Sequence, residues 1–150
     1  MRHILMAVGL IVCSGMASGE PIGRWFSGYG QGTMEYGLKN DSAGSDYFYI
    51  ACPYDGATIS FTVGGKNPRP LSTVIVVVGA EEYELTTDKW GQFRTTSHVS
   101  YDIFRSLWAS MRSGSAMRVR LSSGQSTAFT LKGAAKVLPR DQCETGFEKS

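Results

Sequence analysis

Several segments of the chain alternate between apolar and polar residues with a period of two. In residues 57–63, for example, the odd-numbered positions are apolar and the even-numbered positions are Thr58, Ser60 and Thr62. Because successive side chains of a strand point to opposite faces of a sheet, this pattern predicts a half-buried antiparallel strand. On the same period, or on their content of β-forming residues, the further predicted strands are residues 47–52, 83–87, 92–96, 117–121 and 127–131.

Two segments depart from simple alternation. Residues 74–78 read Val-Ile-Val-Val-Val, so both faces of this strand are apolar. Such a strand is expected to be central and to be covered on both sides. Residues 25–37 mix glycine with aromatic residues, and we expect an irregular opening strand or hairpin there.

The period changes to that of a helix after residue 100. Apolar residues that would share one helical face are Ile103, Phe104, Leu107, Trp108 and Met111. Ser100 is the expected N-cap, and Gly114 would follow the last turn. The pattern therefore predicts a mainly β fold with about seven strands and one helix near 100–113, arranged as an antiparallel sheet or β-sandwich.

The first residues have the layout of a secretory signal peptide. Arg2 precedes an apolar run from Ile4 to Cys13, and small residues follow it. Cleavage is expected after Gly19, with Ala17 as the alternative. The apolar run is short for a membrane span, although a retained anchor is the alternative interpretation. We expect residues 1–19 to be a signal peptide and residues 20–150 to form a single β-rich domain. That domain would be periplasmic or secreted and would have no membrane span.

Two cysteines remain after the predicted cleavage, Cys52 and Cys143. An even pair in an oxidising compartment is most simply a disulfide. The only histidine of the mature domain is His98, and two cysteines with one histidine cannot supply four protein ligands to a metal. No metal site and no cofactor are therefore expected.

Charge excludes one class of partner. The chain has 15 Lys and Arg against 13 Asp and Glu. Loss of Arg2 with the signal peptide leaves 14 against 13, a net charge of +1. Such an interspersed balance argues against nucleic-acid binding. Arg118 and Arg120, with Lys132, could still form a cationic stripe for an acidic partner, or simply keep a sheet face hydrated.

Candidate chemistry is sparse. His98 would need an acid such as Asp102 or Asp55 to act in a hydrolase, and the serines beside it are better explained as helix caps. Trp and Tyr are favoured at protein interfaces but also fill cores. The aromatic residues that we consider as binding residues are Trp25, Tyr29, Tyr36 and Trp90.

The C-terminal third resembles a known group of small exported bacterial proteins. The residues that carry the resemblance are Leu107, Met111, Gly114, Met117, Val119, Gly124, the run Phe129-x-Leu131-x-Gly133, and Cys143. The group comprises the invasion-associated locus B family and accessory proteins of type VI secretion. This resemblance implies an exported β domain with a helix, a hairpin and a cysteine paired to an earlier strand.

A second resemblance concerns the pattern Tyr49-x-x-Cys52, Gly56-x-x-Ile59, which is similar to the first hairpin of periplasmic lysozyme inhibitors. Their Ser-Gly-x-x-Tyr inhibitory loop does not occur in this sequence. The sequence thus does not support lysozyme inhibition as such.

Together these features predict a non-enzymatic binding protein of the bacterial periplasm or envelope. Its partner would be another protein, namely a toxic effector, a wall hydrolase or a secretion component. The chain would act as an immunity or inhibitor protein or as a secretion accessory. The alternatives are an envelope-polymer hydrolase that uses His98 and a secreted virulence or host-contact factor.

Overall fold

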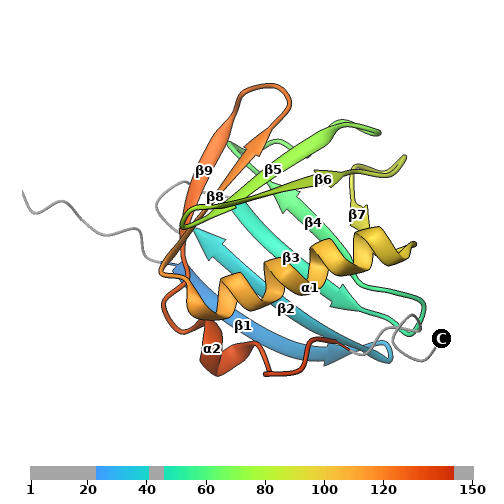
Figure 1. The fold of residues 1–150 in the computed structure, drawn as a ribbon, viewed down its shortest axis with the longest axis vertical. Helices are drawn as coiled ribbons and strands as arrows, with labels where there is room; N and C mark the ends of the chain where they lie inside the picture. The colour runs from blue at the N-terminus through green and yellow to red at the C-terminus, as the bar shows by residue number, and fades with distance from the viewer. Residues whose placement is uncertain (1–22, 41–45, 144–150) are drawn as a thin grey trace, which may run out of the picture.

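The computed structural model describes residues 23–40 and 46–143. The predicted signal peptide lies outside these residues. In the described part of the chain, nine strands form two antiparallel sheets that face each other, with one long helix beside them (Figure 1). This confirms the predicted fold class, a mainly β, sandwich-like domain with one main helix.

The first sheet has the order β1-β2-β3-β4-β7. Its strands are β1 (Gly23–Gly30), β2 (Thr33–Asn40), β3 (Asp46–Cys52), β4 (Thr58–Thr62) and the short β7 (Phe93–Arg94). The second sheet has the order β6-β5-β8-β9. Its strands are β5 (Thr73–Val78), β6 (Glu81–Thr86), β8 (Ala116–Leu121) and β9 (Ser126–Thr130). The helices are α1 (His98–Ser113) and α2 (Ala134–Val137).

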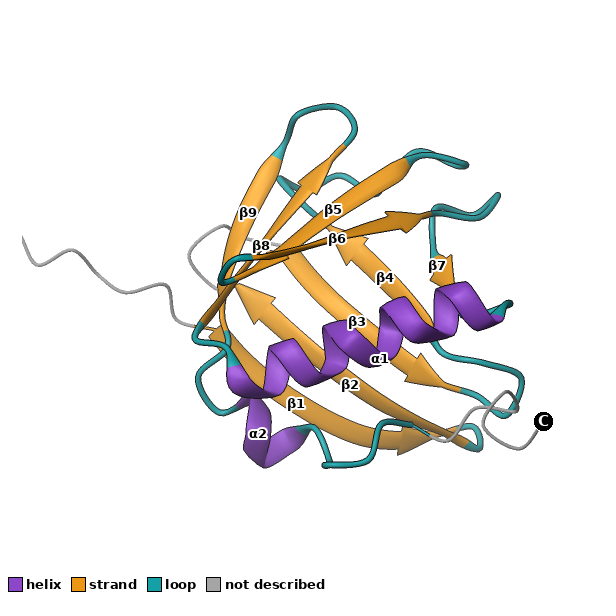
Figure 2. Cartoon of the chain, in the orientation of Figure 1, coloured by secondary structure: helices purple, strands orange, loops and turns teal. Residues whose placement is uncertain are grey.

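The core lies between the two sheets and is closed on one side by α1 (Figure 2). The largest fully buried side chains come from both sheets and from the helix, including Phe48, Phe61, Phe104, Trp108 and Phe129. Burial of such aromatic side chains dominates the stability of a domain of this size.

Helix α1 contacts both sheets directly. Trp108 packs edge-on against Tyr36 of β2, with ring centroids 5.2 Å apart. On the other side, the hydroxyl oxygen of Tyr83 on β6 lies 2.6 Å from the Ser110 hydroxyl oxygen. The helix therefore links the two sheets along their open side.

The predicted disulfide is present. Cys52 at the end of β3 is bonded to Cys143, which follows α2, and their Cα atoms are 5.5 Å apart. The bond ties the C-terminal segment to the first sheet.

Three details of the prediction are corrected by the structure. The opening segment 25–37 is a hairpin, which was one of the two predicted alternatives, but it is regular and not irregular. Its strands β1 and β2 are joined by Gln31 and Gly32 in left-handed conformations, as two-residue hairpin turns require. This hairpin is one reason why there are nine strands instead of about seven. Strand β5 is buried on one face only, since Ile75 and Val77 on its outer face stay half-exposed.

The helix starts earlier than predicted. Ser97 is the N-cap, and its side chain accepts a hydrogen bond from the backbone N–H of Ser100 over 3.2 Å. The Ser100 hydroxyl in turn accepts one from the Ser97 backbone N–H over 3.0 Å. Ser100 thus completes the cap from inside the first turn, because reciprocal bonds satisfy two otherwise unpaired amides.

Candidate functional site

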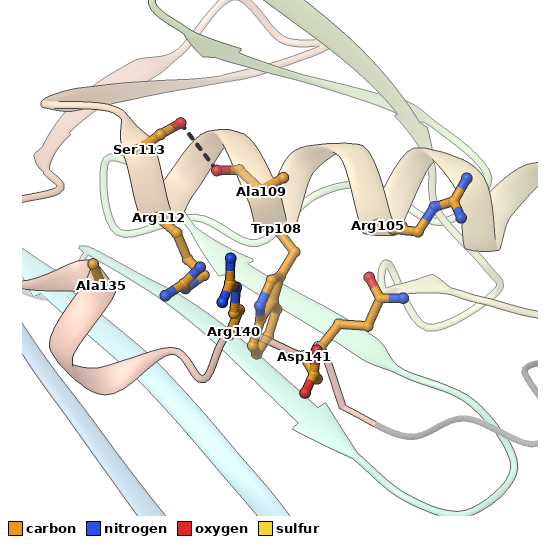
Figure 3. A pocket seen from close by; sticks show the side chains of 9 residues that line it. Arg105, Trp108, Ala109, Arg112, Ser113, Ala135, Arg140 and Asp141 are labelled. Atoms are coloured by element: carbon orange, nitrogen blue, oxygen red, sulfur yellow. Dashed lines mark hydrogen bonds between the residues drawn. The ribbon is translucent and has the colours of Figure 1, made fainter.

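A basic groove runs along the outside of α1, where α2 and the segment after it pack against the helix. A cavity of about 570 Å³ is lined by Arg105, Trp108 and Arg112 of α1 and by residues 140–142 (Figure 3). A second cavity, of about 680 Å³, shares Arg112 and Ala135 with the first and adds Lys132 and Lys136. We call these two joined cavities the basic groove.

The helical repeat explains how α1 contributes to the groove. Arg105, Trp108 and Arg112 are spaced by three and then four residues, so they lie on one face of the helix. Trp108 belongs to the core and is only 2% exposed, and it lines the cavity together with the two arginines. On this face Trp108 is therefore structural, whereas the arginines beside it line the cavity.

Two hydrogen bonds fix the C-terminal segment against this face. The indole N–H of Trp108 donates to the carbonyl oxygen of Pro139 over 3.1 Å. The Nε–H of Arg112 donates to the carbonyl oxygen of Leu138 over 3.0 Å. These bonds bring Arg140 alongside Arg112, and Figure 3 shows their side chains converging beside Trp108.

The charge of the groove is strongly positive. Its described lining contains five cationic side chains, Arg105, Arg112, Lys132, Lys136 and Arg140, and one acidic side chain, Asp141. Arg105 pairs with Asp102 over 3.3 Å, but both side chains are more than half exposed, so this pair is weak.

The chemistry of the groove suits carboxylate or phosphate groups. A guanidinium presents a planar fork of N–H donors that matches two oxygens of such an anion. The bond from Arg112 Nε to Leu138 holds that fork in place and leaves its two terminal nitrogens for a ligand. The groove can thus receive more than one anionic group along its length.

The predicted cationic stripe does not form as expected. Arg118 and Arg120 are exposed on the outer face of the second sheet, on β8. On the other side of β5, each arginine has a glutamate at the same level of the sheet. Val77 of β5 pairs with Arg118 on one side and Glu82 on the other, and Ile75 pairs in the same way with Arg120 and Glu84. Acids therefore offset these arginines, whereas Lys132 joins the basic groove.

The predicted aromatic residues separate into core and surface. Tyr36 is only 4% exposed, because its ring packs against Trp108 in the core, so it is corrected from a binding residue to a core residue. Trp25 is half-buried and packs against the same core. Tyr29 and Trp90 are 76% and 64% exposed, and they lie on different elements, Tyr29 on β1 and Trp90 in the turn after β6.

His98 is the first residue of α1 and is exposed. The two acids considered as its partners contact arginines instead: Asp55 pairs with Arg94 over 3.4 Å, and Asp102 with Arg105. Within the described residues, no group of three or more His, Cys, Asp or Glu side chains is placed to hold a metal ion. No described helix is long and apolar enough to span a membrane.

Comparison with known families identifies the domain. A sequence model of the YfjT family matches residues 23–138, which run from β1 through α2. The chain belongs to the YfjT family. Comparisons with curated proteins and with solved structures gave no match. The YfjT match includes four of the five groove cations, and Arg140 and Cys143 lie beyond its last matched residue, 138.

Sequence reasoning missed the groove. The seven-residue spacing of Arg105 and Arg112 on a predicted helix was a usable signal, because it places both on one face. Arg140 gave no such signal, since its position depends on the contact between Trp108 and Pro139, which are 31 residues apart.

Proposed function

We propose that this YfjT-family chain is a non-enzymatic binding protein of the bacterial periplasm or envelope, and that it holds an acidic segment of a partner protein in the basic groove. The observation that carries the proposal is the convergence of Arg112 and Arg140 beside Trp108, extended by Lys132 and Lys136 in the joined cavity.

An extended acidic segment suits the groove better than a single small anion. The cations are distributed over two cavities, and the exposed apolar residue Ala135 lines both of them. Acidic side chains with apolar neighbours would satisfy both features, because complementary charge gives specificity while apolar contact contributes affinity.

The groove is also preorganised. The Trp108 and Arg112 hydrogen bonds to residues 138 and 139, together with the Cys52–Cys143 bond, anchor its C-terminal wall on both sides of Arg140. A wall that is already ordered loses little conformational entropy on binding. A disulfide of this kind also suits an oxidising compartment.

The partner would be a toxic effector, a wall hydrolase or a secretion component. Binding to an acidic surface of an effector or hydrolase would make the chain an immunity or inhibitor protein. Binding to a secretion component would make it an accessory. The chemistry of the groove is the same in each case, so identification of the partner decides between these roles.

The test compares two charge reversals of equal size. The groove variant is Arg112→Glu with Arg140→Glu, and the matched control is Arg118→Glu with Arg120→Glu on the outer face of the second sheet. Each mature protein is titrated with fluorescein-labelled poly-glutamate and is used to capture partners from native envelope extract. We expect the wild type and the control to bind the probe and to retain one stoichiometric partner, and the groove variant to lose both.

Equal losses in the two variants would contradict the proposal, because the effect would then follow net charge instead of the groove. Retention of the partner by a correctly folded groove variant would contradict it as well. Mass spectrometry of the retained protein separates an effector or hydrolase from a secretion component.

A further inference from the structure

Two neighbouring turns project large apolar side chains from one end of the second sheet. Leu71 lies in the turn before β5, and Trp90 lies in the turn after β6. Thr73 pairs with Thr86, so both turns are at the same end of the sheet, as Figure 1 shows. Leu71 is 76% exposed and Trp90 is 64% exposed.

Asp88 holds the two turns together. Its carbonyl oxygen accepts hydrogen bonds from the backbone N–H of Leu71 over 3.1 Å and of Gly91 over 3.0 Å. Its carboxylate oxygen Oδ1 accepts from the N–H of Trp90 over 2.8 Å and of Gln92 over 3.0 Å. Leu71 and Trp90 are therefore presented by a rigid, shared framework.

Leu71 is held in a strained conformation. Its φ is +54°, a region that residues other than glycine and asparagine seldom adopt. It follows Pro70 in the turn, and the second central position of such a Pro-containing turn normally carries glycine. The exposed leucine side chain gains no packing that would offset this strain, and strain of this kind is typical of functional positions.

The charges around the two side chains are positive. Residues 66–72 and 88–92 contain three cations, Lys66, Arg69 and Lys89, all exposed, and one acid, Asp88. The Asp88 carboxylate faces inward, since Oδ1 bonds to backbone amides and Oδ2 is buried. Lys89 Nζ lies 4.3 Å from the centre of the Trp90 ring.

We propose that Leu71 and Trp90, with Lys66, Arg69 and Lys89, form a docking surface for a bilayer that contains anionic phospholipid. Tryptophan partitions into the interfacial region of a bilayer, leucine enters the hydrocarbon beneath it, and lysine and arginine contact the anionic headgroups. The surface lies on different elements from the basic groove, so it can act independently of the proposed function.

This arrangement favours a bilayer over an apolar pocket of a protein. The two apolar side chains are on turns, and the exposed charged residues of these two segments, 66–72 and 88–92, have a single sign. A bilayer offers a fluid apolar layer under a continuous anionic surface, which complements both features.

The experiment uses the mature protein and sedimented vesicles. One set contains phosphatidylglycerol and phosphatidylethanolamine in equal parts, and the other contains only phosphatidylcholine. We expect binding to the anionic vesicles that weakens with added salt, and little binding to the neutral ones. Leu71→Gly and Trp90→Ala should each lower partitioning about tenfold or more, since each removes a large apolar side chain from the bilayer.

Three matched controls are available. Gln31→Gly changes the other left-handed non-glycine residue in the described part of the chain, whose φ is +50°. Tyr54→Ala removes an aromatic side chain that is 83% exposed in the loop before β4. Arg118→Glu with Arg120→Glu reverses two exposed charges on β8, outside both the groove and the two turns. All three should bind the anionic vesicles like the wild type, and both glycine variants should raise the thermal unfolding midpoint because both relieve strain.

Quenching of tryptophan fluorescence provides a second readout, which is made on the wild-type protein bound to vesicles. Lipids brominated on the acyl chain should quench the wild-type tryptophan fluorescence, and Trp90→Phe should abolish the quenching, because Trp108 is buried and Trp25 is half-buried on β1 of the other sheet. No binding to anionic vesicles would overturn the proposal. The proposal would also be overturned if the groove variant Arg112→Glu with Arg140→Glu lost vesicle binding while Leu71→Gly kept it. If Leu71→Gly and Trp90→Ala instead lost a protein partner without any vesicle binding, the surface would be a protein interface and the proposal would be wrong.

Discussion

The side-chain amide of Asn40, at the end of β2, donates a hydrogen bond to the backbone carbonyl oxygen of Ala128 on β9. Asn40 is 4% exposed, and its amide also lies 3.4 Å from the Thr127 hydroxyl oxygen. Strand β9 is the edge of the second sheet, and β2 belongs to the first. One side chain thus pairs a polar group on a sheet edge and connects the two sheets opposite the side closed by α1.

Asn40→Ala should therefore destabilise the domain. The substitution removes the donor and leaves the Ala128 carbonyl oxygen without it, which costs about 1–3 kcal/mol for a buried polar group. Urea unfolding measures the loss, and Lys39→Ala, at the exposed neighbouring position, should change the unfolding free energy by less than about 0.5 kcal/mol. Equal effects of the two substitutions would show that the cross-sheet bond contributes little.

Removal of the disulfide should have a larger effect. Cys52 and Cys143 are separated by 91 residues, and a bond across so long a segment strongly restricts the unfolded chain. Replacement of both cysteines by alanine should lower the free energy of unfolding by about 2–5 kcal/mol. Reduction of the wild type should reproduce this value and should leave the double variant unchanged. If reduction leaves the midpoint of unfolding where it was, the bond does not contribute to stability.

The sequence predicts the repeating parts of this fold well. Period-two alternation located most of the strands, and the 3.6-residue period located the buried face of α1 from Phe104 to Met111. The cysteine count predicted the bond between Cys52 and Cys143. Each of these features depends on local pattern or simple counting, which a sequence displays directly.

The parts that the sequence did not predict depend on long-range contacts. A tyrosine can serve at an interface or in a core, and the sequence does not distinguish the two. The packing of Tyr36 on Trp108 is what makes it a core residue. The basic groove needs Leu138 and Pro139 to pack on α1, through hydrogen bonds that join residues 26 and 31 positions apart. Periodicity carries no information about such pairs.

The Arg112 guanidinium should be more important to the groove than its charge alone. Arg112→Lys keeps the positive charge but removes the Nε–H bond to Leu138 and the forked donor geometry. We expect poly-glutamate affinity to fall about tenfold, because a bidentate charged contact becomes a single one. Arg105→Lys should change affinity by less than about twofold, since Arg105 is exposed and its pair with Asp102 is weak. Equal effects would mean that the groove recognises charge and not geometry.

Tyr49 should give the domain a distinct response to alkaline pH. It lies on the outer face of β3, diagonal to Glu35 on β2. Burial is the main cause that raises the pKa of Tyr49 from 10.0 to about 12, and the hydrogen bond to Glu35 and the negative charge of that carboxylate raise it further. In the unfolded chain the same hydroxyl would titrate at its ordinary value.

The sign of the effect follows from the number of protons bound. Between about pH 10 and pH 12 the unfolded chain has lost the Tyr49 proton and the folded domain keeps it, so the free energy of unfolding falls as pH rises. The contribution of Tyr49 is complete below pH 10 and is lost as pH rises through about 12. Burial also raises the pKa of Tyr36, so that residue adds a loss of the same sign.

Tyr49→Phe should therefore flatten, but not abolish, the alkaline fall in stability measured by urea unfolding at successive pH values. Glu35→Gln should have a smaller effect, because it removes the negative charge beside Tyr49 but not the burial, which is the larger cause. The ultraviolet absorbance of phenolate provides an independent check, since the late-titrating absorbance of the wild type should be smaller in Tyr49→Phe, where only Tyr36 still has a raised pKa among these two residues. An unchanged late titration in Tyr49→Phe would assign the alkaline loss to another tyrosine, with Tyr36 as the first to examine.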